Sequence, residues 1–186
     1  MKPKMRHLAL YAASIVLVGL AAGPSMAAEK KIVLEAKIGE IVSNSIVRPP
    51  APEGMEAPEF GQEVRVDKAT STDPDWNDAT LMFYEQSVAL ESSGTFRSYG
   101  IATASGGDTM LVQLSGKWDV LNHDGQSEAP FSAEGKLLGG TGKFKGINGT
   151  VAVKGKSTGK GVGTYTVEIT TASEPAQSGS STPQKP

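Results

Sequence analysis

Four large side chains in the middle of the chain could hold a small molecule: Tyr84, Arg97, Tyr99 and Trp118. Each stands in a run rich in β-branched and aromatic residues, a composition that predicts a strand. Inside a small barrel, a tyrosine or an arginine can orient the polar end of an otherwise apolar ligand. The tyrosine and tryptophan side chains would serve equally well as core filling, and Arg97 could simply point to water. The sequence leaves both interpretations open.

A glycine-lysine stretch, Gly139–Lys143, raises the question of phosphate binding, because backbone amides and a lysine together can cradle phosphates. The spacing rejects a P-loop, since Leu137 stands where its first glycine belongs and Phe144 where its Ser or Thr belongs. The dinucleotide fingerprint fails as well, because Lys145 occupies the position of its third glycine. Both motifs require a following helix, whereas a strand pattern follows here.

Other catalytic or metal-binding constellations lack the necessary residues. Residues 73–78 carry oxygen ligands at every second position, but Asp78 replaces the EF-hand glycine and Tyr84 its bidentate glutamate, so we interpret them as a polar turn. The chain has no cysteine, which excludes a thiol mechanism. A serine triad or a zinc site would depend on His123, which we interpret as a solvated turn residue. We expect no metal and no cofactor.

The first 27 residues have the pattern of a secretory signal peptide. Three basic residues precede an apolar run from Leu8 to Ala22, and Ser25-Met26-Ala27 forms a small-x-small cleavage site. An uncleaved membrane anchor is the alternative, but an apolar run of about 15 residues is short for a span of ~20. We therefore predict cleavage near Ala27, a periplasmic or secreted protein, and no membrane span afterwards.

The charge balance argues against nucleic-acid binding. Removing the three basic residues of the signal from the 18 in the chain leaves 15 against 20 acidic residues, a formal charge of −5. Nucleic-acid binders usually show the opposite balance or a basic stripe. The lysines between residues 143 and 160 alternate with glycine and apolar residues, as on the outward face of strands.

Short alternating runs separated by turn residues make up the rest of the chain. We predict strands over residues 31–38, 80–90, 95–104, 109–121, 133–138, 150–154 and 162–171. In the run 109–121, Met110, Val112, Leu114 and Trp118 share one face, which should point inward. Four prolines in residues 48–61 predict a long loop, and residues 172–186 have the composition of a disordered tail. With no helical periodicity after the signal, these features indicate an all-β sandwich or an antiparallel barrel.

The stretch Leu137-Leu138-Gly139-Gly140-Thr141-Gly142-Lys143-Phe144-Lys145-Gly146-Ile147-Asn148-Gly149-Thr150 resembles the glycine-rich hairpin of the dirigent proteins and allene oxide cyclases, including bacterial exported relatives. The resemblance implies a single calycin-like antiparallel barrel of about eight strands over residues 28–171. It carries over only the motif itself, Gly139, Gly140, Gly142, Phe144, Gly146 and Gly149. We interpret these residues as a fold marker with Phe144 and Ile147 packed inward.

The resemblance also implies a lumen that holds a lipophilic small molecule, often in a homodimer or homotrimer. Our first hypothesis is a binding protein for such a molecule that performs no chemistry, with Tyr84, Arg97, Tyr99 and Trp118 as candidate ligand contacts. The alternative is a cofactor-independent cyclase or isomerase, in which Arg97 and Tyr99 stabilise developing charge. A second alternative is a structural envelope or extracellular protein, which predicts a packed lumen without a cavity.

Overall fold

A computed structural model describes residues 29–123, 126–158 and 162–172, and nearly all of them lie in strands. Their strands and two single-turn 3-10 helices are β1 (Glu29–Val47), β2 (Glu59–Thr70), η1 (Pro74–Trp76), β3 (Ala79–Leu90), β4 (Ser93–Thr103), β5 (Thr109–Asp119), β6 (Leu121–His123), β7 (Gln126–Gly140), η2 (Gly142–Phe144), β8 (Asn148–Thr158) and β9 (Gly163–Ala172). The predicted signal peptide and all but the first residue of the predicted tail lie outside the described residues.

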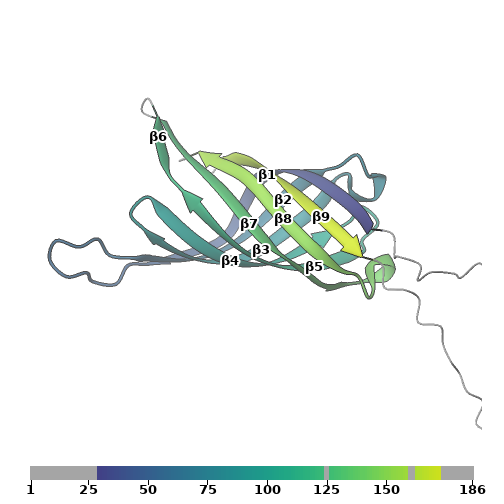
Figure 1. Ribbon diagram of the computed structural model, residues 1–186, viewed down its shortest axis with the longest axis horizontal. Helices are drawn as coiled ribbons and strands as arrows, with labels where there is room; N and C mark the ends of the chain where they lie inside the picture. Colours follow the sequence, from purple (N-terminus) through teal and green to yellow (C-terminus); the bar gives the residue numbers. More distant parts are fainter. Residues whose placement is uncertain (1–28, 124–125, 159–161, 173–186) are drawn as a thin grey trace, which may run out of the picture.

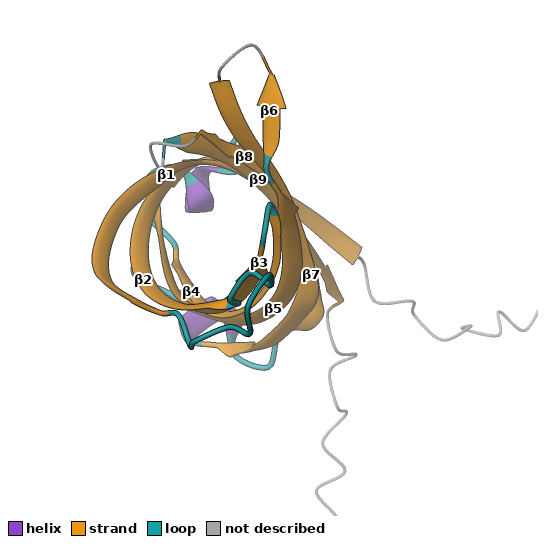
Figure 2. Cartoon of the chain, turned by 90° about the vertical axis from the view of Figure 1, so that its left-hand side faces the viewer, coloured by secondary structure: helices purple, strands orange, loops and turns teal. Residues whose placement is uncertain are grey.

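Eight of these strands close into one antiparallel barrel (Figures 1 and 2). Consecutive strands pair within the series β1 to β5 and within the series β7 to β9. β9 also pairs with β1, and β5 pairs with β7, which completes the ring. The short β6 pairs only with β7 and stands outside the ring. The predicted all-β barrel of about eight strands is confirmed. Closure leaves no unpaired sheet edge around the ring.

Side chains alternate between the lumen and the outer surface along every strand of the ring. The expected parity of β5 is confirmed, since Met110, Val112 and Leu114 are buried. On β9, Tyr165, Val167 and Ile169 are buried as one face. Together with residues of β1 such as Leu34, these side chains form the core inside the barrel.

The glycine-rich stretch closes one end of the barrel, on the right in Figure 1. There η2 follows β7 and places Phe144 against Trp76 of η1, with ring centroids 5.0 Å apart. Both rings are buried, and Ile147 packs against the same core. Gly142 has a φ of 53°, a left-handed conformation that favours glycine. The interpretation of this stretch as a turn with inward-packed Phe144 and Ile147 is therefore confirmed.

Several elements differ from the expectation. β7 begins at Gln126 where a start at residue 133 was predicted, and β8 ends at Thr158 where an end at residue 154 was predicted. β1 extends past the predicted end at residue 38 to Val47, through two register shifts that mark bulges. β2 was not predicted at all, although it is twelve residues long. The proline-rich connection between β1 and β2 is shorter than expected, because residues 59–61 already pair with β3. In the described part of the chain, no helix has the length and apolar character to cross a membrane.

Candidate functional site: the barrel lumen

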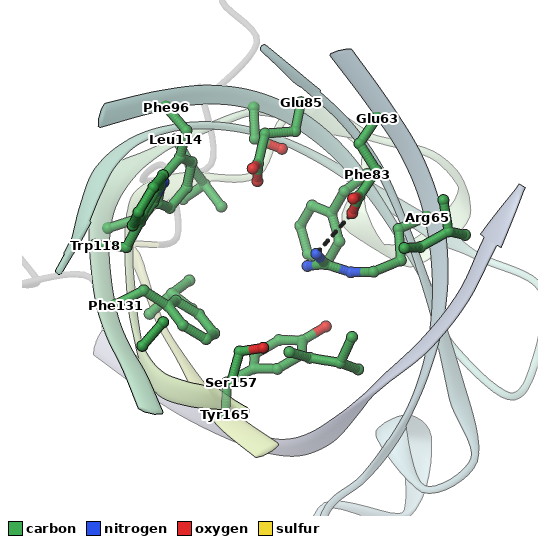
Figure 3. Close-up of a pocket in the computed structure, with 16 residues that line it drawn as sticks. Glu63, Arg65, Phe83, Glu85, Phe96, Leu114, Trp118, Phe131, Ser157 and Tyr165 are labelled. Atoms are coloured by element: carbon green, nitrogen blue, oxygen red, sulfur yellow. Dashed lines mark hydrogen bonds and ion pairs between the residues drawn. The ribbon is translucent and has the colours of Figure 1, made fainter. Parts of the chain in front are cut away.

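A cavity of about 310 Å³ occupies the half of the barrel away from the η1 and η2 turns. Side chains from all eight strands of the ring line it, and two groups among them matter for its chemistry (Figure 3). We call the first the aromatic wall: Phe96, Leu114, Trp118 and Phe131, from β4, β5 and β7. We call the second the polar wall: Glu63, Arg65, Glu85, Ser98 and Tyr165, from β2, β3, β4 and β9, together with Asp67 of β2, which is buried behind the lining.

The rings of the aromatic wall lie over glycines on neighbouring strands. Trp118 pairs directly with Gly94, and Phe96 pairs with Gly116. A methyl group at either glycine would overlap the ring opposite it. The missing side chain therefore lets each ring lie back against the barrel wall. This arrangement keeps the centre of the lumen open while presenting apolar surface to it.

Asp67 is the centre of the polar wall and is almost fully buried. Its Oδ1 accepts a 2.6 Å hydrogen bond from the backbone N–H of Gly39, and its Oδ2 accepts from the Tyr165 hydroxyl and from Nε of Arg65 at 2.9 Å. Gly39 lies in the first bulge of β1, where a Cβ would collide with the Val66 carbonyl. Asp67 thus satisfies a backbone donor that the bulge frees from the ladder.

Arg65 links Asp67 to Glu63, with its Nη1 3.0 Å from the Glu63 carboxylate. Its guanidinium carbon also lies 5.6 Å from the centre of the Phe83 ring and 6.0 Å from that of Tyr165, within range of cation–π attraction. Burial disfavours the charged guanidinium, but Asp67, Tyr165 and Glu63 outweigh this effect and raise the pKa of Arg65 above its ordinary value. Arg65 is therefore a fixed cation held between two carboxylates.

Glu85 lacks this kind of support. It is the direct cross-strand partner of Glu63 on the inner face, an arrangement that places two carboxylates side by side. Burial is the main cause that raises the pKa of Glu85 to about 7; Glu63 and Asp67 add to the effect, while Arg65 opposes it. The pKa of Tyr165 is also raised, chiefly by burial and then by Asp67. Glu85 is thus the lumen group that can exchange a proton near neutral pH.

Of the four candidate ligand contacts, the structure places Trp118 in the lumen and the other three outside it. Tyr84, Arg97 and Tyr99 lie on the outer face of β3 and β4, where Tyr84 is 42% and Tyr99 50% exposed. Their inward neighbours are Phe83, Glu85, Phe96 and Ser98, because side chains alternate along a strand. On each of these two strands, the prediction chose the wrong one of the two alternating faces. Ligand binding by any of the four remains a prediction.

The tyrosines instead belong to an apolar patch on the outside of the barrel. Tyr84 and Tyr99 are direct cross-strand partners, and the next row on the same face joins Met82, Ile101 and Leu111. All five are at least 40% exposed. We call these five residues the outer patch.

Half of the polar wall was not predicted, because Glu63, Arg65 and Asp67 lie on β2, a strand that the sequence analysis did not identify. In the segment Glu63-Val64-Arg65-Val66-Asp67 the charged residues point inward and the two valines outward, the reverse of the usual pattern. The available signal was strict alternation itself, which predicts a strand whichever face is charged. Over residues 29–123, 126–158 and 162–172, no three histidine, aspartate or glutamate side chains are grouped so that they could hold a metal ion.

Comparisons with known proteins give little beyond the fold. No protein-family model and no curated protein sequence matches the chain. Among solved structures, it is similar to the pterocarpan synthase dirigent protein GePTS1, with 15% sequence identity and a TM-score of 0.48. That match covers 87% of this chain and 98% of the other. Folds of this kind host unrelated functions, so the lumen residues themselves must indicate what this protein does.

Proposed function

We propose that the barrel binds a small molecule in its lumen, with the apolar body of the ligand on the aromatic wall and a polar group toward Glu85. The cavity carries this proposal. Its volume of about 310 Å³ lies at the lower end of the range for small-molecule sites. Aromatic surface on one side and a few polar groups on the other is the usual composition of such sites.

A purely structural envelope or extracellular protein predicts a packed lumen, and the cavity counts against that alternative. The interior of the barrel is packed at one end and open in the other half. Around Trp76 and Phe144 the rings stack and fill the space, whereas around Trp118 glycines are placed so that the space stays open. A protein selected only for stability would gain by filling the second half as well.

The two tryptophans of the chain offer a matched test. Trp118 lines the cavity, whereas Trp76 is buried at the closed end. In a W76F variant, titration with small neutral alcohols such as 2-phenylethanol should change the remaining tryptophan fluorescence. In a W118F variant the same titration should leave it unchanged. If native mass spectrometry of the gently extracted protein shows no ligand, and no fluorescence change occurs in W76F, the proposal is wrong.

A cofactor-independent cyclase or isomerase is the second candidate, and Glu85 is the observation that favours it. A carboxyl group with a pKa of about 7 is suited to give and take a proton at neutral pH. Arg97 and Tyr99 cannot carry charge stabilisation inside the lumen, because both lie on the outer face. Under this candidate, E85Q should abolish turnover while R97A and Y99A keep it; full turnover in E85Q would remove the role of Glu85.

Export and self-association are also proposed. The amino-terminal pattern supports export, and the amino-terminal sequence of the mature protein would establish whether cleavage occurs near Ala27. The outer patch supports a homodimer or homotrimer, since contiguous exposed apolar surface commonly marks an interface. Light scattering after size exclusion should give a multiple of the chain mass, reduced to one chain by a Y99K substitution; a wild-type monomer would exclude the assembly.

A further inference from the structure

Glu85 and Ser98 are two polar groups of the lumen that lack hydrogen-bond partners. They are direct cross-strand partners on β3 and β4, and both line the cavity. Ser98 is 1% exposed, and its hydroxyl has no hydrogen-bond partner. Within the described chain no side chain or backbone N–H donates to the Glu85 carboxylate. Because buried hydroxyls are nearly always paired, the unpaired Ser98 hydroxyl at a cavity wall, beside the half-buried Glu85 carboxylate, points to a ligand that pairs it.

The polar wall also has an excess of negative charge. The described charged residues that line the cavity are Glu63 and Glu85 against the single cation Arg65, and Asp67 adds a third carboxylate behind the lining. Arg65 is already shared between Glu63 and Asp67, at 3.0 and 2.9 Å. Both oxygens of Asp67 accept hydrogen bonds as well. The uncompensated charge is therefore centred on Glu85, beside the unpaired Ser98 hydroxyl.

We propose that the lumen selects a small organic cation: a primary or secondary ammonium group that binds Glu85 and Ser98, on an aromatic or aliphatic body that packs against the aromatic wall. This inference rests on the proposed lumen binding and specifies its ligand class. An ammonium group can donate to the Glu85 carboxylate and to the Ser98 oxygen together. Its charge balances Glu85, whereas a ligand carboxylate would face the carboxylates of Glu63 and Glu85 and a guanidinium that is already shared.

The shape of the lumen agrees with this chemistry. The polar group must approach Glu85 and Ser98, which both line the cavity. The body then extends toward the rings of Trp118 and Phe131, which Figure 3 shows on one side of the lumen. Aromatic faces also attract a cation that lies near them. A body of one ring with a short chain fits a cavity of about 310 Å³.

Binding of the cation should depend on pH. The groups that face Glu85 are Glu63, Arg65 and Asp67 on β2, while Tyr165 on β9 joins through Asp67. Glu85 has a pKa of about 7, so it is mostly ionised at pH 8 and mostly protonated at pH 5.5. An ammonium ligand requires the ionised form, so its affinity should fall over this interval. A neutral alcohol should be much less affected.

Three probes with similar bodies test the charge directly: 2-phenylethylamine, 2-phenylethanol and 3-phenylpropionate, measured by isothermal titration calorimetry at pH 8. We expect the amine to bind at least about tenfold more tightly than the alcohol, the gain typical of a charge-assisted hydrogen bond, and the carboxylate to bind most weakly. E85Q should lose the preference for the amine, because a glutamine can hydrogen-bond to an amine or an alcohol but does not balance a positive charge. S98A should weaken the amine to a smaller degree.

Glu134 supplies the matched control, because it is a glutamate exposed on the outer face of β7. E134Q should leave all three affinities unchanged, and a circular dichroism spectrum of E85Q that matches wild type shows that its fold is intact. Alcohol or carboxylate binding as tight as that of the amine would overturn the cation proposal while lumen binding stands. An amine preference that survives in E85Q would overturn the assignment to Glu85. Failure of all three probes to bind would count against lumen binding itself and the cation proposal with it.

Discussion

Glu85 should make the stability of the protein depend on pH in a way that one substitution removes. Its pKa is raised from the ordinary 4.5 to about 7 in the folded protein, mainly by burial. Between these two values the folded state binds more protons than the unfolded state. The free energy of unfolding therefore falls as the pH rises from 4.5 to 7. Below pH 4.5 the Glu85 carboxyl group does not lower the free energy of unfolding, and above pH 7 it lowers it by the full amount.

The size of the effect follows from the shift. A difference of 2.5 pKa units corresponds to roughly 3 kcal/mol at pH 8, at 1.36 kcal/mol per unit. Gln has nearly the same shape as Glu and no charge, so E85Q should remove this cost. We expect E85Q to be more stable than wild type by roughly 3 kcal/mol at pH 8, relative to the difference between the two at pH 4.5.

Urea unfolding followed by circular dichroism at pH 4.5, 6 and 8 measures this difference for both proteins. E134Q is the control for the loss of a glutamate, because Glu134 is exposed on the outer face, and its difference from wild type should not vary in the same way. A stability difference between E85Q and wild type that stays constant across the three pH values would refute the reasoning. It would mean that the Glu85 carboxylate is well compensated in the folded state.

Three further substitutions test how the barrel supports the lumen, each by urea unfolding. D67A removes the carboxylate that holds Arg65 and should cost about 3–5 kcal/mol, as expected when one partner of a buried ion pair is lost; a cost below about 1 kcal/mol would contradict the network. G142A should cost about 1 kcal/mol or more because of its positive φ and its closeness to the neighbouring loop, whereas G106A, with open space around it, should cost less; equal costs would count against the turn geometry. F144A should cost about 3–5 kcal/mol, and a much smaller loss would show that the end of the barrel is not packed as described.

The sequence predicted the fold class because alternation and turn chemistry are local signals. Apolar residues at every second position of β1, β5 and β9 face one way whatever the partner strand, so their inward faces followed from the pattern alone. The turn in the glycine-rich stretch could be predicted from that stretch alone. A position with a positive φ, such as Gly142 at 53°, favours glycine whatever the surrounding fold. Closure of the sheet into a ring was predicted only from the family resemblance. The pairing of β5 with β7 joins residues that are distant in the sequence, so it leaves no local signal.

The identity of the residues that line the lumen depended on tertiary structure more than the fold class did. Where both faces of a strand carry large side chains, as in β3 and β4, composition cannot decide which face is inside, and the choice between Tyr84 and Glu85 followed from the register of the neighbours. The polar wall reverses the usual pattern, because its charges become tolerable inside only when Tyr165 of β9 and the Gly39 N–H of β1 meet Asp67 and Arg65 of β2. The sequence by itself determined that this chain forms an antiparallel β-protein with a glycine-rich turn. Only the closed barrel decided which charges share its interior, since their partners lie up to 98 residues apart.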